Sequence, residues 1–254
     1  MLVVDTHTHV ISDDFGKYPL QVADYPGVEW VHEAPVTAEE LLAEMAVAGV
    51  DRAVLVQAQG GYGTDNSYVV DARAAYPEKF SAVAIVDDPA ELDALAAAGV
   101  GGVRFFAIGG GGPLHDEATW DTARRLSLRV SAATVPEYLP ALGEAVAAHP
   151  DVILALDHCG FAPETIRNYA YLANLYLKVT PHVLDAGDPA AMLERLADQF
   201  GLDRLMWGSD YSQTHDRPYL ELADQARAAC AGLTRSEQAQ FLGGTALSLW
   251  PELQ

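Results

Sequence analysis

At 254 residues, half of them apolar, the chain can bury a sizeable core. Its 15 basic and 36 acidic residues give a net charge of −21, which argues against nucleic acid or an anionic membrane as a partner. No apolar run approaches the roughly 20 residues that span a bilayer, and the start MLVVDTH lacks the features of a signal peptide. The two cysteines, Cys159 and Cys230, suit a reducing compartment. We therefore expect a cytoplasmic protein.

Apolar segments alternate with helix-like segments along the whole chain. The apolar segments are continuous rather than alternating, which is typical of parallel strands that are buried on both faces. They comprise residues 2–5, 51–57, 80–86, 100–106, 128–134, 152–157, 174–180 and 203–209. The segments between them are rich in Ala, Leu and Glu, and they comprise residues 37–48, 65–75, 89–98, 117–126, 136–148, 163–172, 188–200 and 217–230.

Several of the expected helices carry start signals. Thr37 with Glu40 forms a capping box, and Thr234 with Glu237 opens an additional helix at 234–246. Three other helices have a proline in the first turn, where the missing N–H is not needed.

Eight consecutive strand–helix units predict either a closed parallel barrel or a doubly wound sheet. The count of eight and the chain length favour the (β/α)8 barrel, and the Gly-rich turn of a dinucleotide-binding sheet is missing after the first strand. No linker or charge block divides the chain. We therefore expect an α/β fold with one domain over residues 1–254, a TIM barrel with an extra C-terminal helix.

Candidate metal ligands follow three of the expected strands. In such a barrel, catalytic groups gather at the C-terminal ends of the strands. His7 and His9 follow the first strand, and residues i and i+2 of an extended chain point to the same side. His158 follows the sixth strand and Asp210 the eighth. Imidazole and carboxylate groups are ligands that suit zinc, so a metal site is one interpretation of these four side chains.

Other polar residues at the strand ends are candidates for substrate binding. Arg104 lies in the fourth expected strand, where a charge is rarely buried unless it is paired. We expect it to bind a substrate carboxylate or carbonyl with its two-pronged guanidinium. Gln57 and Tyr62, after the second strand, would assist it. His182 and Tyr211, after the seventh and eighth strands, are further expected substrate contacts.

Two loops are expected to shape the pocket, at 11–36 and 107–115. The loop with glycines at 109–112 lacks the Gly-Lys-Ser/Thr of a phosphate-binding loop, so we interpret it as a flexible lid. Cys159 is expected to be a small buried residue rather than a nucleophile, and His149 is expected to be structural.

Five motifs carry a resemblance to a known family, in the expected order along the chain. They are VDTHTHV at 4–10, GVGGVRFF at 99–106, LALDHCGF at 154–161, RLMWGSDYS at 204–212 and GLTRSEQAQFLGGTALSLW at 232–250. Together they resemble the amidohydrolase-related (amidohydrolase 2) family of TIM-barrel metal-dependent hydrolases. The most similar branch contains pyrone-dicarboxylate, sulfomuconolactone and sugar-acid lactonases.

The resemblance implies a role for each matching residue. His7 and His9 match the metal pair of the first strand. Asp210 matches an aspartate that holds metal and moves the proton of the attacking water. His158 matches a metal ligand of some members and a substrate-side group of others, and Arg104 matches a substrate-binding arginine.

This sequence departs from the binuclear members of the family. Those carry a bridging lysine or glutamate at the end of the fourth strand and a histidine at the fifth, where this chain reads VRFF and SAAT. We therefore expect one divalent metal ion, zinc ahead of manganese, and a metal-free mechanism stays open because some lactonases of this branch work without metal.

The leading hypothesis is hydrolysis of a lactone or similar cyclic ester, with Asp210 as general base and Arg104 gripping a carboxylate-bearing substrate. One alternative is metal-dependent decarboxylation of an aromatic or unsaturated acid, against which the missing histidine of the fifth strand counts. Another is a barrel that only binds a ligand. A homo-oligomer is left open.

Overall fold

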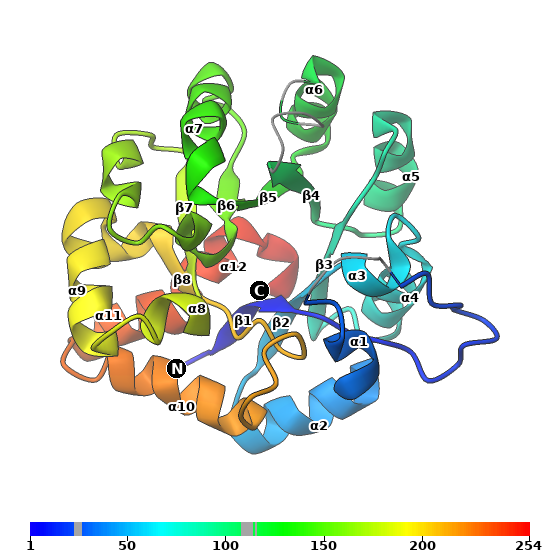
Figure 1. The fold of residues 1–254 in the computed structure, drawn as a ribbon, viewed down its shortest axis with the longest axis horizontal. Helices are drawn as coiled ribbons and strands as arrows, with labels where there is room; N and C mark the ends of the chain where they lie inside the picture. Colours follow the sequence, from blue (N-terminus) through cyan, green and yellow to red (C-terminus); the bar gives the residue numbers. More distant parts are fainter. Residues whose placement is uncertain (23–26, 108–113, 115) are drawn as a thin grey trace.

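The eight strands form one parallel sheet that curls into a barrel with helices around it (Figure 1). The computed structural model describes residues 1–22, 27–107, 114 and 116–254. Neighbouring strands pair in the order β1 to β8, and a bridge between Thr8 and Tyr211 joins the two edges of the sheet. The expected (β/α)8 TIM barrel is thus confirmed.

The strands are short, as is usual in such barrels. They are β1 (Val4–Thr8), β2 (Arg52–Val56), β3 (Phe80–Ala84), β4 (Gly102–Ala107), β5 (Arg129–Thr134), β6 (Leu154–Leu156), β7 (Leu175–Val179) and β8 (Leu205–Trp207). The first strand was expected to end at residue 5, and that end is wrong, because β1 continues through His7 to Thr8.

Longer helices follow most of the strands and cover the outside of the barrel. They are α2 (Ala38–Ala48), α4 (Ser67–Ala75), α5 (Leu92–Ala97), α6 (Glu117–Leu126), α7 (Leu139–Ala148), α9 (Pro189–Phe200) and α10 (Tyr219–Ala229). Three helices of a single turn lie in the loops: α1 (Trp30–Glu33), α3 (Gln59–Tyr62) and α8 (Pro181–Leu184). The expected capping boxes at Thr37 and Thr234 are both formed.

The helix expected at 163–172 is wrong. The chain there forms only the 3-10 turn Ile166–Tyr169, with successive hydrogen bonds between residues three apart. Thr165, Asn168 and Tyr169 are all modest helix formers, and Pro163 supplies no N–H, so the segment has little intrinsic preference for a regular helix.

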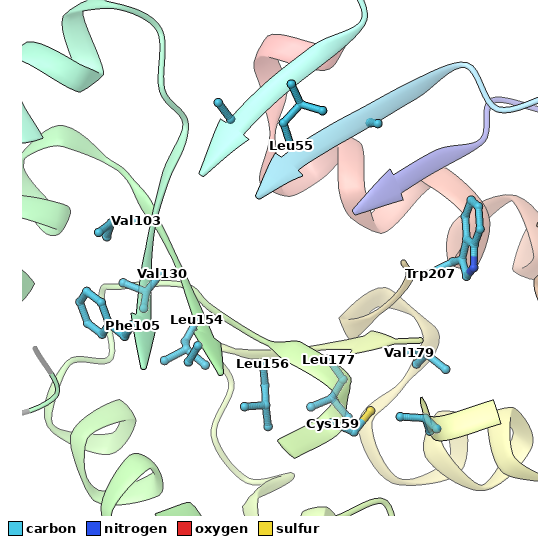
Figure 2. Packing of buried hydrophobic residues seen from close by; sticks show 14 of the residues in the cluster. Leu55, Val103, Phe105, Val130, Leu154, Leu156, Cys159, Leu177, Val179 and Trp207 are labelled. Atoms are coloured by element: carbon cyan, nitrogen blue, oxygen red, sulfur yellow. The ribbon is translucent and has the colours of Figure 1, made fainter. Parts of the chain in front are cut away.

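Two sets of apolar side chains make up the core. Residues on the outer face of the strands, such as Leu55, Phe105 and Leu156, pack under the helices (Figure 2). Residues on the inner face, such as Val54, pack with Trp250 instead. The predicted C-terminal helix is therefore present as α11 (Arg235–Ala239), a π turn and α12 (Thr245–Leu249), and it adds its apolar residues to the interior of the barrel. Among the described helices, none is long and apolar enough to cross a bilayer.

Candidate active site

A bulge in β1 turns His7 into the barrel. Asp5 pairs with Ala53 of β2 and Thr8 pairs with Leu55, so β1 uses three residues where β2 uses two. Such a bulge re-aims the side chains that follow it. The carboxylate of Asp5 accepts a hydrogen bond from the Tyr219 hydroxyl of α10, outside the barrel, whereas His7 lies inside it. The imidazole rings of His7 and His9 consequently point to the same place inside the barrel.

Glycine at position 208 allows the end of β8 to approach β1 closely. A Cβ at Gly208 would lie 2.9 Å from Cβ of His7. Ser209 and Asp210 follow at once, and the backbone N–H of Asp210 donates to the carbonyl oxygen of His7 over 2.8 Å. The eighth strand therefore delivers the Asp210 carboxylate directly beside the two histidines.

His7, His9 and Asp210 form the floor of the candidate site. Oδ1 of Asp210 lies 3.4 Å from Nε2 of His7 and 3.4 Å from Nε2 of His9. All three side chains are buried, and within the described residues none of these three atoms has a hydrogen-bond partner. Buried polar atoms rarely lack partners, so their convergence points to a ligand.

The donor set of the floor fits a divalent metal ion. Nδ1 of His9 donates to the carbonyl oxygen of Val56 over 2.8 Å, which leaves the lone pair of Nε2 facing the centre. Ligand atoms at about 2.1 Å from a tetrahedral zinc ion lie about 3.4 Å apart. The separations from Asp210 to both histidines match that value.

The second oxygen of Asp210 is held from the other side. Oδ2 accepts hydrogen bonds from Nε2 of His182 over 3.0 Å and from the Thr214 hydroxyl over 3.2 Å. Burial opposes the charge of Asp210, but His158 and the other histidines around it hold its pKa well below its usual range. The hydrogen bond to Asp210 in turn raises the pKa of His182. Asp210 is therefore a carboxylate at neutral pH.

His158 enters the site from a left-handed turn after β6. His158, Cys159, Gly160 and Phe161 all have φ between 51° and 65°. In an extended strand, neighbouring side chains point to opposite faces, whereas this turn lets Asp157 and His158 both face the site. Burial lowers the pKa of His158 to about 4, so the ring is neutral at physiological pH. Its Nδ1 lies 2.9 Å from the Thr180 hydroxyl.

A charged network lies inside the barrel, beside the floor. Arg104, Ser131 and Lys178 each stand between two residues of the outer core, so they point to the inner face. Oδ1 of Asp157 lies 2.9 Å from Nζ of Lys178 and accepts from the Ser131 hydroxyl over 2.7 Å. Oδ2 accepts from Nε of Arg104 over 3.0 Å. Burial opposes the charge of Asp157, but Lys178, His7 and Arg104 hold its pKa well below its usual range.

Asp157 also orients His7. Nδ1 of His7 lies 3.3 Å from Oδ1 of Asp157 and 3.3 Å from Nζ of Lys178. The ammonium of Lys178 has closer partners in Asp157 and Ser131, so Nδ1 can donate to the Asp157 carboxylate. That tautomer leaves Nε2 free to bind at the floor. Burial lowers the pKa of His7 well below its usual value, so this ring is neutral as well.

A cavity of about 160 Å³ opens above the floor. Its walls combine one guanidinium, three aromatic rings, two imidazoles and two amides: they comprise His9, Trp30, Gln59, Gly60, Arg104, Phe106, Ala133, His158, Phe161 and Gln213. Because Nε of Arg104 is bound to Asp157, its remaining N–H groups are the ones available to a ligand.

The structure places three of the expected substrate contacts away from this cavity. The amide nitrogen of Gln57 donates to the carbonyl oxygens of Gly63 and Asp65, so it stabilises the loop after β2. The Tyr62 hydroxyl accepts from the backbone N–H of Ser12. The Tyr211 ring packs on Tyr219, outside the barrel. Of that group, His182 does reach the site, through Asp210.

The other singled-out residues have local roles. His149 caps α7 and stacks on Trp120 with ring centroids 4.4 Å apart, as its structural interpretation requires. Cys159 is buried, and burial raises the pKa of its thiol above its usual range, which leaves it unsuited to act as a nucleophile. The glycines at 109–112 and His115 lie outside the described residues.

Sequence reasoning missed several members of the site. Asp157 and Lys178 were visible as charged residues within segments expected to be buried strands. A charge in such a segment is rarely buried without a partner, and this was the available signal. Trp30 belongs to the loop expected at 11–36, and its ring lies 5.4 Å from that of His9. Nothing in the sequence marked Gln213 or Phe161 as cavity residues.

The family is decided by the sequence match over nearly the whole chain. The profile of the amidohydrolase family matches residues 4–251. The chain belongs to this family. It is therefore an amidohydrolase-superfamily enzyme, as the motifs predicted. None of the curated proteins compared with it matches significantly.

Solved structures share the fold of this amidohydrolase. A protein from Pseudomonas putida, provisionally assigned as a 2-pyrone-4,6-dicarboxylic acid hydrolase, superimposes with a TM-score of 0.81 at 21% identity, over 100% of this chain and 98% of its own. An amidohydrolase from Burkholderia multivorans with bound zinc gives 0.78 at 18% identity, over 99% of each chain. The 5-carboxyvanillate decarboxylase of Sphingomonas paucimobilis gives 0.74 at 15% identity, over 98% of this chain and 99% of its own.

Proposed function

We propose that this amidohydrolase opens a lactone or a similar cyclic ester by attack of an activated water. The observation that carries the proposal is the convergence of three buried, unpartnered atoms beneath a cavity: Nε2 of His7, Nε2 of His9 and Oδ1 of Asp210. A carbonyl group brought to this point would meet acceptors for a proton and ligands for a metal in one place.

His7, His9 and Asp210 would hold one divalent ion, and two imidazoles with one carboxylate suit zinc. When bound, this ion supplies Lewis acidity, which polarises a carbonyl group and lowers the pKa of water. The zinc in the Burkholderia structure supports this assignment. A second ion is not proposed, because Ala133 and Thr134 at the end of β5 offer no strong ligand.

Asp210 would accept the proton of the attacking water and pass it to the leaving ring oxygen. Its Oδ1 is the atom for this step, since Oδ2 is already held by His182 and Thr214. Oδ1 has two lone pairs, so one can face the ion and the other can accept the proton. His158 is neutral and beside Asp210, so it can stabilise the oxyanion of the tetrahedral intermediate by hydrogen bonding. In a metal-free version of the reaction, the histidines and Arg104 would provide this stabilisation alone.

Arg104 would hold a carboxylate of the substrate. Its Nε is bound to Asp157, and this contact fixes the plane of the guanidinium above the floor. A carboxylate can then accept two parallel hydrogen bonds from the other nitrogens, which sets the orientation of the ring to be opened.

Decarboxylation of an aromatic or unsaturated acid is the second candidate. The specific observation in its favour is the set of aromatic walls around the cavity, Trp30, Phe106 and Phe161, which suits a flat ring. The shared fold of the Sphingomonas decarboxylase is compatible with it. The absence of a histidine at the end of β5 favours hydrolysis.

A product assay on the wild type and on Asp210→Asn tests the proposal. A panel of carboxylate-bearing lactones would be followed by acid release in a pH-stat, beside CO2 release from aromatic acids. We expect acid release by the wild type and a fall of about 10²- to 10⁴-fold in kcat for Asp210→Asn. Full lactonase activity in Asp210→Asn would refute the mechanism, and CO2 release without acid release would establish the second candidate.

A further inference from the structure

A second, larger cavity adjoins the inner cavity above the floor. It has a volume of about 410 Å³ and shares Trp30 and Gln213 with the inner cavity. His182, the partner of Asp210, lies in its wall. We call this space the vestibule. A substrate that reaches the floor and is longer than the inner cavity would extend past Trp30 and Gln213 and have its outer end in the vestibule.

The walls of the vestibule are strongly acidic. Its described lining contains four carboxylates, on Glu29, Glu33, Asp185 and Asp216, against one guanidinium, on Arg217. Arg217 is already bound to both aspartates. In the described part of the chain, the ionic partner of Glu33 is His215 at 3.5 Å, and the side chain of Glu29 makes no capping hydrogen bond. The space as a whole is therefore negative.

A separate observation points to a ligand in the inner cavity. Nε2 of His9 is buried, unpartnered and part of its wall. The inner cavity also contains the guanidinium of Arg104, whose partner Asp157 is neutralised further by Lys178. The inner cavity thus offers a substrate one cationic group, the guanidinium of Arg104, whereas the vestibule is lined mainly by carboxylates.

We propose that the substrate carries a single carboxylate, which Arg104 holds, and a neutral or cationic group at the opposite end, and that the vestibule rejects a second carboxylate. This inference rests on the proposed function, in which Arg104 binds the substrate carboxylate. It adds a substrate class: ring acids or lactone acids with an uncharged, hydroxylated or amino-bearing outer end.

The size of the discrimination follows from Coulomb's law. Two carboxylates at about 8 Å from a unit charge of the ligand, in a solvent-exposed site, change the affinity for that ligand by about threefold to tenfold. Because the vestibule is open to water, added salt reduces this discrimination. The contact with Arg104 is more enclosed and is less sensitive to salt.

Calorimetric binding of three non-reactive acids tests the proposal on the intact chain. The probes are benzoate, isophthalate with a second carboxylate, and 3-(aminomethyl)benzoate with a cationic arm. The test variant is Glu29→Gln with Glu33→Gln. The matched control is Glu78→Gln with Glu194→Gln, which removes the same charge from exposed positions outside both cavities.

We expect the wild type to bind isophthalate more weakly than benzoate and 3-(aminomethyl)benzoate more tightly. The test variant should bind isophthalate about threefold to tenfold better and the amine correspondingly worse, with benzoate unchanged, and the control should behave as the wild type. Equal binding of the three acids by the wild type, or the same response in both double variants, would overturn the inference.

A third variant, Arg104→Gln, separates this inference from the proposed function. If it loses affinity for all three acids, the carboxylate anchor is correct, and the comparison among acids decides the inference on its own. If the acids bind equally well to Arg104→Gln, or if none of them binds the wild type, the anchor in the proposed function fails and the inference fails with it.

Discussion

Lys178 on β7 and Asp157 after β6 form an ion pair of 2.9 Å with both side chains wholly buried. The same carboxylate binds Arg104 and lies against His7. One buried anion therefore aligns a histidine of the proposed metal site and the proposed substrate anchor at once. A pair of this kind is sensitive to the loss of either partner, because the remaining charge stays buried.

The stability of the Lys178–Asp157 pair can be measured by a double-mutant cycle. Lys178→Met and Asp157→Asn should each lower the free energy of unfolding by about 3–5 kcal/mol, since each leaves a buried charge without its main partner. The double variant should lose clearly less than the sum of the two. Guanidinium denaturation in the presence of a chelator gives the three values. Strictly additive losses would show that the two residues act independently.

Removal of a floor histidine should abolish metal binding. We expect about one divalent ion per wild-type chain by elemental analysis, and a small fraction of that in His9→Gln, because the variant loses one of three ligands. His32→Gln is the matched control, since His32 is exposed and is not one of the floor residues. The same metal content in both variants would contradict the assignment of the floor.

Arg104→Lys should separate charge from geometry at the substrate anchor. A lysine keeps the positive charge but cannot offer two parallel N–H groups, so kcat/KM for a carboxylate-bearing substrate should fall by about tenfold to a hundredfold. For the methyl ester of the same substrate, the two enzymes should differ little. An equal fall for acid and ester would mean that Arg104 acts by supporting Asp157 rather than by binding the carboxylate.

Asp5 should give the stability a distinctive pH dependence. Its carboxylate accepts hydrogen bonds from His7, Ser209 and Tyr219, yet burial raises its pKa to about 6. The native state therefore holds this proton more tightly than the unfolded chain. The contribution of Asp5 is fully present below pH 4 and is lost as the pH rises through 6, by about 3 kcal/mol.

The comparison with Asp5→Asn separates the titration of Asp5 from the titration of the other carboxylates. The variant keeps the size and most hydrogen bonds of the side chain but does not titrate. The difference in unfolding free energy between wild type and variant, measured with chelator from pH 4 to 7, should change in favour of the variant as the pH rises. A difference that is constant over this range would show that Asp5 is not protonated in the native state.

Much of the scaffold was predictable because it depends on local patterns. The helix expected at 117–126 has those bounds in the structure. The capping box of Thr37 with Glu40 starts α2 as expected. The continuous apolar segments predicted parallel strands that are buried on both faces. A barrel surrounded by helices is built from strands of this kind. His7, His9, His158 and Asp210 could be grouped because every parallel strand delivers its C-terminal end to the same rim.

The remainder of the site depends on geometry that sequence periodicity does not describe. The bulge in β1 separates the directions of Asp5 and His7, although residues two apart in a regular strand share a face. The left-handed turn places Asp157 and His158 on one side, although adjacent strand residues alternate. Gln57 looked like a substrate contact, but the carbonyl groups of its own loop already bind its amide.

Trp30 and Gln213, which divide the inner cavity from the vestibule, belong to α1 and to the segment after Asp210 rather than to the barrel strands. Glu29 and Glu33, two of the carboxylates proposed for substrate choice, lie at α1 and thus outside the strands that carry His7 and Arg104. Exchange of α1 and its flanking loop between relatives should retarget the enzyme to acids of another charge pattern while its reaction is retained.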